Sequence, residues 1–186
     1  MTSDHGIRPV FPAELRLTGH GLTLREWTDD DLTAMVELFD NPDVAYRTPL
    51  VSPFDLAAAR DYLQKARRTR AEDLRLHLAI TTDGQQPQGE VLLARSNSGV
   101  GAGSIGYSVG AAHRGRRLAT RAVRVMTEYA HQVAAMPRVL LEIEGDNDAS
   151  TAVARAAGFH LTDAPPIRAE DKGCSFTLLT WAHGAS

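Results

Sequence analysis

The apolar residues of this chain follow two different periods, and the change from one to the other predicts its secondary structure. Ile105, Tyr107 and Val109 alternate with small or polar residues, which is the period of a strand with one buried face. From Ala119 and Val123 onward, apolar positions recur every three or four residues, as on one face of an amphipathic helix. The sequence therefore predicts a strand, a tight turn and a helix in direct succession.

Similar patterns along the rest of the chain predict a mixed sheet with helices on both faces. A helix-capping sequence starts at Thr28, Asn41-Pro42 is expected to end that helix, and Ser52-Pro53 is expected to begin the next one. Strands are expected over residues 15–18, 22–27, 74–81, 90–95, 104–109, 138–144, 159–161 and 175–181.

The same patterns predict how the chain is divided. Residues 1–14 contain two prolines and are expected to form a flexible N-terminal arm. Residues 15–186 are expected to form a single domain, because they contain no long linker and no repeat. Within this domain, residues 96–103 are expected to form a flexible loop.

The turn before the predicted helix has the composition of an anion-binding site. The first turn of a helix presents backbone N–H groups without acceptors, and the helix dipole adds partial positive charge. Gly115 allows a ligand to approach the backbone closely, and Arg114, Arg116 and Arg117 carry charges that suit phosphate oxygens. We interpret residues 114–120 as a pyrophosphate site. The alternative is an ordinary strand–helix connection with a solvated, basic first turn.

A second motif follows further along the chain. The predicted strand Arg138–Glu144 ends in Gly145–Ser150, which has the composition of a turn and a helix cap. A helix rich in small residues is expected over Thr151–Ala157, and Gly158 is expected to end it.

These two motifs resemble the acetyl-CoA signatures of the GNAT acetyltransferase superfamily. The segment RGRRLA is similar to the family's R/Q-x-x-G-x-G/A, with Arg114 as its first residue and Ala119 as its last. The segment NDASTAVARAAGF resembles N-x-x-S followed by a helix and Gly-Phe, with Asn147 and Ser150 as the matching residues. The opening segment LRLTGHGLTLREWTDDDL is similar to that of the RimJ/RimL-type branch, which acetylates protein N-termini and small amines.

The resemblance implies both a fold and an activity. The expected fold class is α/β (α+β), namely the GNAT fold, in which a mixed central sheet of about seven strands is flanked by helices on both faces. The expected activity is acetyl transfer from acetyl-CoA, without a metal, to the primary amine of a peptide, a protein or a small molecule. Transfer is expected by direct attack in a ternary complex. The alternatives are a non-catalytic acyl-CoA-binding module and a nucleic-acid-binding domain that uses Arg114 to Arg124.

The resemblance also implies which residues bind the co-substrate. The strands on either side of the first helix motif are expected to splay apart, so that the pantetheine arm lies between them. Donors around Tyr107 to Val109 are expected to polarise the thioester carbonyl, and Asn147 is expected to bind the pantetheine amide. The implied acetyl-CoA-binding residues are Ser108, Val109, Arg114, Gly115, Arg116, Arg117, Leu118, Ala119, Thr120, Asn147 and Ser150.

Four residues are candidates for catalysis, and each has a structural alternative. Ser150 is expected to donate a proton to the departing sulfur, or else to cap the helix. Glu142 or Glu144 is expected to accept the amine proton, or else both are solvated carboxylates on a half-exposed sheet face. Tyr107 is expected to act as an acid or to pack in the core.

Two positions depart from the family pattern. Arg117 stands where the motif has its middle glycine, so the loop loses a flexible residue and gains a cation. Ala154 stands where many members have the tyrosine that protonates the CoA thiolate, so another group or solvent must donate that proton.

Composition narrows the classes of function. A chain of 186 residues, 43% of them hydrophobic, can bury one substantial core, and a net charge of −3 argues against a general nucleic-acid binder. The single Cys174 excludes a disulfide framework, and seven scattered histidines give no metal-ligand spacing. No apolar run is long enough to span a membrane and the N-terminus lacks a signal-peptide core, so a cytoplasmic protein is expected. A homodimer is left open.

Overall fold

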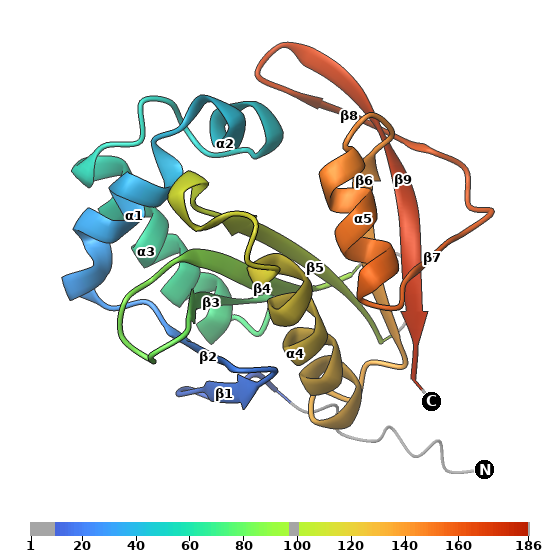
Figure 1. Ribbon diagram of the computed structural model, residues 1–186, viewed down its shortest axis with the longest axis horizontal. Helices are drawn as coiled ribbons and strands as arrows, with labels where there is room; N and C mark the ends of the chain where they lie inside the picture. The colour runs from blue at the N-terminus through green and yellow to red at the C-terminus, as the bar shows by residue number, and fades with distance from the viewer. Residues whose placement is uncertain (1–9, 97–100, 186) are drawn as a thin grey trace.

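One nine-stranded sheet forms the centre of the protein (Figure 1). The computed structural model describes residues 10–96 and 101–185, and in these residues the strand order is β1-β2-β3-β4-β5-β6-β9-β7, with β8 also paired to β9. The strands are β1 (Arg16–Gly19), β2 (Leu22–Glu26), β3 (Arg75–Thr81), β4 (Gly89–Arg95), β5 (Ala102–Val109), β6 (Arg138–Glu144), β7 (His160–Leu161), β8 (Ile167–Asp171) and β9 (Cys174–Gly184). The helices are α1 (Leu32–Phe39), α2 (Pro42–Arg47), α3 (Leu56–Ala71), α4 (Leu118–Gln132) and α5 (Asp148–Ala156), with short 3₁₀ turns η1 (Asp29–Asp31) and η2 (Ala111–His113).

Helices cover both faces of this sheet, as the sequence predicted. The amphipathic helix α4 packs its apolar stripe, including Val123 and Met126, against the core-facing side chains of β3, β4 and β5. The opposite face is covered by α1 and α3, which enclose a second apolar cluster that includes Phe39, Phe54 and Leu63. The expected mixed α/β fold class is confirmed. The parallel pair β5 and β6 is flanked by antiparallel neighbours.

The observed elements differ from the predicted ones in several places. Residues 102 and 103 of the expected loop 96–103 belong to β5, because they pair with neighbouring strands. Asn41-Pro42 ends α1 but also begins α2, because the Asn41 side chain accepts a hydrogen bond from the Asp43 backbone N–H and proline fits the first helical position. The next helix begins at Leu56 rather than at Ser52-Pro53, because Asp55 provides its cap. The strand β8 was not expected and forms a hairpin with β9.

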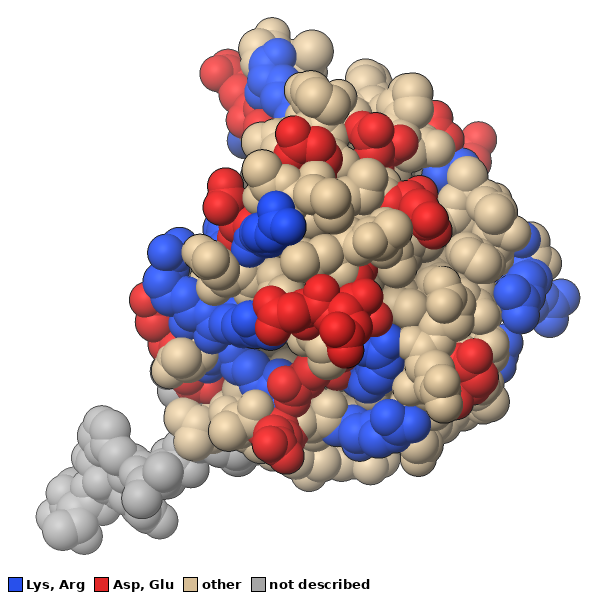
Figure 2. Space-filling model, turned by 90° about the vertical axis from the view of Figure 1, so that its left-hand side faces the viewer, with Lys and Arg blue, Asp and Glu red and all other residues tan. Residues whose placement is uncertain are grey.

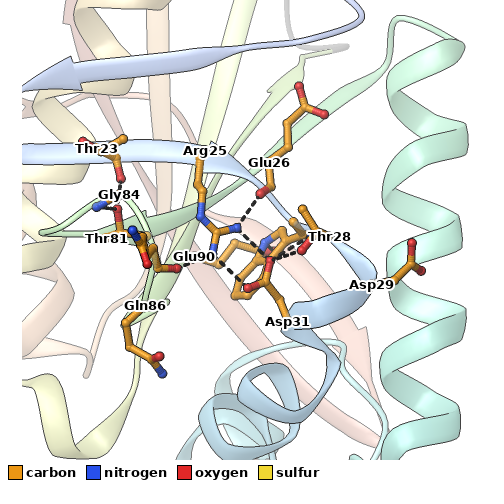
Figure 3. Close-up of polar contacts among 12 residues, drawn as sticks. Thr23, Arg25, Glu26, Thr28, Asp29, Asp31, Thr81, Gly84, Gln86 and Glu90 are labelled. Atoms are coloured by element: carbon orange, nitrogen blue, oxygen red, sulfur yellow. Dashed lines mark hydrogen bonds and ion pairs between the residues drawn. The ribbon is translucent and has the colours of Figure 1, made fainter.

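A buried ion pair fixes the entry of the chain into α1 (Figure 3). Arg25 on β2 donates two hydrogen bonds to Asp31, at 2.7 and 2.8 Å, and also bonds the Glu26 and Gln85 carbonyls. Asp31 accepts further bonds from the Thr28 backbone and hydroxyl. Burial opposes the charge of Asp31, but the bonds from Arg25 and Thr28 outweigh it and lower the pKa of this carboxyl. The pair therefore joins β2, η1 and the β3–β4 turn.

The described part of the expected N-terminal arm is held against the domain. Phe11 is buried in the main core, its backbone N–H donates to Asp73 at 2.8 Å, and the Arg95 guanidinium lies over its ring. Arg70 donates to the Pro12 carbonyl at 2.8 Å. Residues 10–14 therefore do not form a loose arm. The expected arm at 1–9 and the central part of the expected loop, 97–100, lie outside the described residues.

Charged residues of both signs are interspersed on the face that carries α1 and α3 (Figure 2). Two arginines at the basic end of α3 are paired with acids, Arg67 with Asp29 at 2.8 Å and Arg70 with Glu26 at 2.9 Å. Arg67 lies on the solvated surface, whereas the Arg70 side chain is mostly buried. Among the helices of the described segments, none combines the length and apolarity needed to cross a bilayer.

Two histidines join the end of α4 to the end of β9. His131 Nδ1 donates to the Met136 carbonyl at 2.7 Å, so its Nε2 accepts from His183 Nδ1 at 3.0 Å. Burial lowers the pKa of His183, and the proximity of His131 and His160 adds to the effect. Protonation of this histidine therefore opposes the folded state.

We expect the free energy of unfolding to fall as the pH is lowered below about 6.5, the pKa of an unperturbed histidine. In that range the unfolded chain binds a proton at His183 that the folded chain resists binding, so acid favours unfolding. Urea titrations at several pH values measure this slope. His183→Asn should reduce it. An unchanged slope in the His183 variant would contradict this prediction.

Candidate active site

The parallel pairing of β5 and β6 stops after three residue pairs. Ala102, Gly103 and Ser104 pair with Arg138, Val139 and Leu140, and no pairing between the two strands continues beyond them in the described residues. The strands then diverge toward the end of the sheet where α2 lies (Figure 1). The expected splay is therefore present, and it leaves the edges of β5 and β6 facing an opening.

The turn that follows β5 places the start of α4 beside this opening. Gly115 has a φ of +77°, and a Cβ atom built there would meet no other atom within 4 Å. Glycine is thus suited to the backbone conformation, and the space around it is open. Leu118, Ala119 and Thr120 form the first turn of α4, whose backbone N–H groups have no acceptor within the helix.

Arg117 adopts the left-handed conformation at the N-cap of α4, with φ 56° and ψ 26°. This geometry explains why the family motif has glycine at the position, since glycine adopts it without a steric cost. For a residue with a Cβ atom, the left-handed region costs roughly 1–2 kcal/mol. Arg117 therefore holds the left-handed conformation at a cost in stability.

Most arginines of the Arg114–Arg124 cluster bind other parts of the protein. Arg114 pairs with Asp43 at 2.9 Å, and Arg116 donates to Gln88 at 3.4 Å. Arg121 donates to the His20 and Gly21 carbonyls, and Arg124 donates to the Ala156 carbonyl. In the described residues, Arg117 alone among these five makes neither a hydrogen bond nor an ion pair through its side chain. Four of these guanidinium groups are therefore engaged by oxygen atoms of this chain.

The second motif forms the start of α5 on the other side of the opening. Asn147 is its N-cap, and its Oδ1 accepts from the Ser150 backbone N–H at 3.1 Å. The alternative interpretation of Ser150 as the cap residue is therefore wrong, because Asn147 fills that position. The Ser150 hydroxyl makes no hydrogen bond within the described residues, and the Asn147 amide NH₂ likewise makes none.

Tyr107 connects the two sides. It projects from β5, is half-buried against the core, and its hydroxyl donates to the Ser150 backbone carbonyl at 3.5 Å. Burial raises the pKa of Tyr107, so the hydroxyl stays protonated at neutral pH. The structure thus brings two of the four candidate catalytic residues together across the opening.

The two glutamates of β6 have different surroundings. Glu144 is mostly buried and pairs with Arg47 of α2 at 2.8 Å, and Arg47 also binds Asp146 at 3.0 Å. Glu142 is exposed and lies opposite Thr180 of β9. One carboxylate is therefore engaged by a cation, and the other faces solvent.

The sequence interpretation missed α2, which is attached to three other elements. Asp43 binds Arg114 of the loop before α4, Arg47 binds Glu144 at the end of β6, and Lys172 of the β8–β9 turn donates to two carbonyls of the α2 region. An N-cap residue followed by proline is a helix-start signal, so Asn41-Pro42 could have indicated this helix. Its tertiary contacts have no local signal.

In the described part of the chain, no group of three or more histidine, cysteine, aspartate or glutamate side chains is arranged to hold a metal ion.

The fold is that of an acyl-CoA-type transferase, as defined by the opening between β5 and β6, the start of α4 beside it and the two linked motifs. The chain belongs to the acetyltransferase (GNAT) domain family, whose model matches residues 21–160.

Solved structures share this fold. One is RimJ of Mycobacterium smegmatis, in complex with CoA-disulfide, which is 19% identical to this chain with a TM-score of 0.78. The match covers 92% of this chain and 87% of the RimJ chain. The ribosomal-protein-S5-alanine acetyltransferase of Vibrio fischeri is 16% identical with a TM-score of 0.75, and the match covers 92% of this chain and 97% of that protein. The microcin C7 self-immunity acetyltransferase MccE, in complex with acetyl-CoA and AMP, is 18% identical with a TM-score of 0.77. The match covers 90% of this chain and 94% of MccE. Among curated proteins, none matches the chain.

We expect Arg117→Gly to raise the free energy of unfolding by about 1 kcal/mol, because glycine adopts the left-handed N-cap without the steric cost. Arg117→Ala is the matched control: it removes the same charge but keeps the Cβ atom, so it should not stabilise the protein. Equilibrium denaturation of both variants checks this. Equal stability of the glycine and alanine variants would contradict a conformational cost at residue 117.

Proposed function

We propose that this chain is an acetyl-CoA-dependent N-acetyltransferase that acetylates a primary amine by direct attack in a ternary complex. One observation carries the proposal: the opening between β5 and β6 ends between the first turns of α4 and α5, which contain the two motifs of the family. The acceptor is the amino group of a peptide or protein N-terminus, or that of a small amine.

The first turn of α4 suits the pyrophosphate of CoA. The backbone N–H groups of residues 118–120 and the helix dipole supply the positive field, and the free Arg117 guanidinium supplies a full charge. The pantetheine arm would then lie along the open edge of β5, at Ser108 and Val109. Since Asn147 Oδ1 is occupied by the helix cap, its NH₂ group is the part that can donate to a pantetheine carbonyl.

Two hydroxyls are placed to serve the departing thiolate. Ser150 has no hydrogen-bond partner in the described residues, and Tyr107 approaches the same turn from β5. Because burial raises the pKa of Tyr107, it is available as a neutral donor at the pH of the reaction. We assign Ser150 as the donor to sulfur and Tyr107 as the alternative donor, in place of the tyrosine that Ala154 replaces.

The two glutamates of β6 stay candidates for accepting the amine proton. Arg47 pairs with Glu144 at 2.8 Å and occupies a lone pair of this carboxylate, which opposes a role as base. Glu142 is paired with no cation in the described residues, and it faces solvent. A cytoplasmic location and a homodimer also stay predictions.

A non-catalytic acyl-CoA-binding module is the second candidate function. Arg117 in place of the motif glycine and Ala154 in place of the tyrosine favour it. Binding without turnover distinguishes it from an enzyme.

We expect acetyl-CoA to raise the thermal midpoint of unfolding, because it binds the folded chain. At a free acetyl-CoA concentration of about 100 times the dissociation constant, binding stabilises the folded state by about 2.7 kcal/mol. Thr120→Asp, of similar size, should keep the fold but abolish this shift, because a carboxylate in the first turn of α4 repels phosphate. Turnover is then measured by mass spectrometry, as gain of one acetyl group on peptides with free N-terminal alanine or serine and on simple diamines. No thermal shift would overturn the assignment; a shift without any acetylated product would favour the binding module.

Ser150→Ala should lower kcat with little change in the affinity for acetyl-CoA, because a donor to the developing thiolate acts in the transition state. Loss of a general acid typically costs about 10²–10⁴-fold. Tyr107→Phe is the companion variant, and the larger of the two losses identifies the donor. Because Asn147 caps α5, the thermal midpoint should not fall in the serine variant. Near-normal kcat in both variants would leave solvent as the donor.

A further inference from the structure

The helix α2 is held against the rest of the protein mainly by polar contacts. Val44 is its buried residue, and it packs in the apolar cluster on the α1–α3 face of the sheet. Asp43 pairs at 2.9 Å with Arg114, which lies in the loop between β5 and α4. On the other side, Arg47 pairs at 2.8 Å with Glu144 at the end of β6. Because β5 and β6 are the two strands that border the opening, α2 is bound to both of its sides.

A lysine of the β8–β9 turn binds the C-terminal end of the same helix. Lys172 Nζ donates to the Ala45 carbonyl at 2.6 Å and to the Thr48 carbonyl at 2.8 Å. The tip of the β8–β9 hairpin accordingly lies beside α2 (Figure 1). The last carbonyls of a helix have no donor within the helix and carry partial negative charge, so a cation is a suitable partner for them. Lys172 thus connects α2 to a hairpin that follows it by more than a hundred residues in the sequence.

The β8–β9 turn itself does not favour lysine. Asp171 pairs with Cys174, so Lys172 and Gly173 form a two-residue hairpin turn, with φ values of 49° and 77°. Turns with two left-handed residues prefer asparagine or aspartate followed by glycine, because these side chains tolerate the left-handed conformation best. Since the turn gains nothing from lysine, the two bonds to α2 are what this side chain provides.

Under the proposed function, the two faces of the sheet serve different substrates. The phosphate site at the start of α4 lies on the face that α4 and α5 cover, because buried residues of both helices belong to the main core cluster. Val44 places α2 on the opposite face. An amine that attacks the thioester directly needs a path that bound acetyl-CoA does not fill, and the end of the opening bordered by α2 and the β8–β9 turn stays available for it.

From these contacts we propose that Lys172 sets the width of the acceptor entrance, by holding the C-terminal end of α2 against the β8–β9 turn. With α2 held in place, the entrance admits amines on an unbranched carbon or on one with a small substituent, and it discriminates against bulkier groups beside the nitrogen. Lys172 is a positioning residue, because it acts through α2 and does not touch the reacting atoms. The inference rests on the proposed acetyltransferase function and specifies which acceptors that function selects.

Lys172→Asn separates this role from the stability of the turn. Asparagine favours the left-handed conformation but is too short to bind both α2 carbonyls, so the hairpin is kept while the contact with α2 is lost. The thermal midpoint should therefore be unchanged or higher. Asp43 and Arg47 are less suited to this test, because their partners Arg114 and Glu144 belong to the proposed co-substrate and catalytic residues.

Acceptor selectivity is measured with two substrates. One is the acceptor that wild type acetylates fastest, and the other is its analogue with a bulkier group on the carbon that carries the amine, such as an N-terminal leucine in place of alanine. In Lys172→Asn, the kcat/KM of the bulkier acceptor relative to the smaller one should rise by about tenfold or more, mainly through a lower KM. The dissociation constant of acetyl-CoA should not change, because the phosphate site lies on the other face.

Lys172→Arg and Lys65→Gln are the controls. Arginine keeps a cation with several donors, so it should restore most of the wild-type selectivity. Lys65, the only other lysine of the chain, lies exposed on α3 and makes neither a hydrogen bond nor an ion pair within the described residues. Its replacement by glutamine removes the same charge and should leave the selectivity unchanged.

Hydrogen exchange tests the contact without any activity. The Ala45 and Thr48 backbone N–H groups donate to the Asn41 and Val44 carbonyls, so their exchange reports local unfolding of α2. Lys172→Asn should accelerate exchange at these two groups by about tenfold, because hydrogen bonds to a charged group are lost. The amides of β8 and β9 should exchange as in wild type.

Unchanged exchange in α2, or faster exchange with unchanged selectivity, would overturn the inference while leaving the proposed function in place. An equal loss of kcat/KM for both acceptors would overturn it as well. Failure of wild-type protein to acetylate any acceptor would overturn the proposed function and the selectivity role with it, even where the exchange of α2 responds as expected.

Discussion

The short contact between β5 and β6 is the constraint on which the site depends. Parallel strands that pair over only three residues, up to Ser104 and Leu140, must diverge as the sheet twists, and their remaining edges keep unused backbone donors and acceptors. Because α4 follows β5 and α5 follows β6, both helix starts lie at the mouth of the opening. A ligand with amides and a phosphate at one end matches this arrangement of strand edges followed by helix N-termini.

The N-termini of α4 and α5 are capped in different ways. At α5 the Asn147 side chain accepts from the backbone, which is the usual role of an N-cap asparagine. At α4 the cap residue is Arg117, whose side chain makes no cap bond, so the first-turn N–H groups stay available. The N-terminus of α5 is therefore capped by a side chain of the protein, whereas the free N–H groups of α4 are suited to binding an anion.

Local patterns predicted the central part of the site, and tertiary contacts account for what they missed. The strand–turn–helix at 105–130 and the strand–cap–helix at 138–157 have strong periodicity, so their elements were predicted within a few residues. The partners of Arg114 and Arg47 were not predictable, because Arg47 and Glu144 are 97 residues apart and meet only through the fold. Local patterns also did not indicate that Glu90 of β4 is buried, because one glutamate at the start of an apolar strand looks like a solvated end. Asp31 shows the contrast: that buried carboxylate pairs with Arg25, whereas the partners of Glu90 in the described residues are the Trp27 indole and the Tyr62 hydroxyl, with His77 at 3.5 Å.

The attachments of α2 make the entrance to the opening sensitive to ionic strength. Asp43 and Arg114 are half-exposed or more, and the bonds of Lys172 to the α2 carbonyls are also at the surface. Charges at the surface are screened over about 8 Å at physiological salt, while the buried Arg25–Asp31 pair below is screened far less. Added salt would thus loosen the helix that borders the entrance before it affects the sheet beneath. The third attachment of α2, Arg47 to the mostly buried Glu144, would resist salt better than the other two.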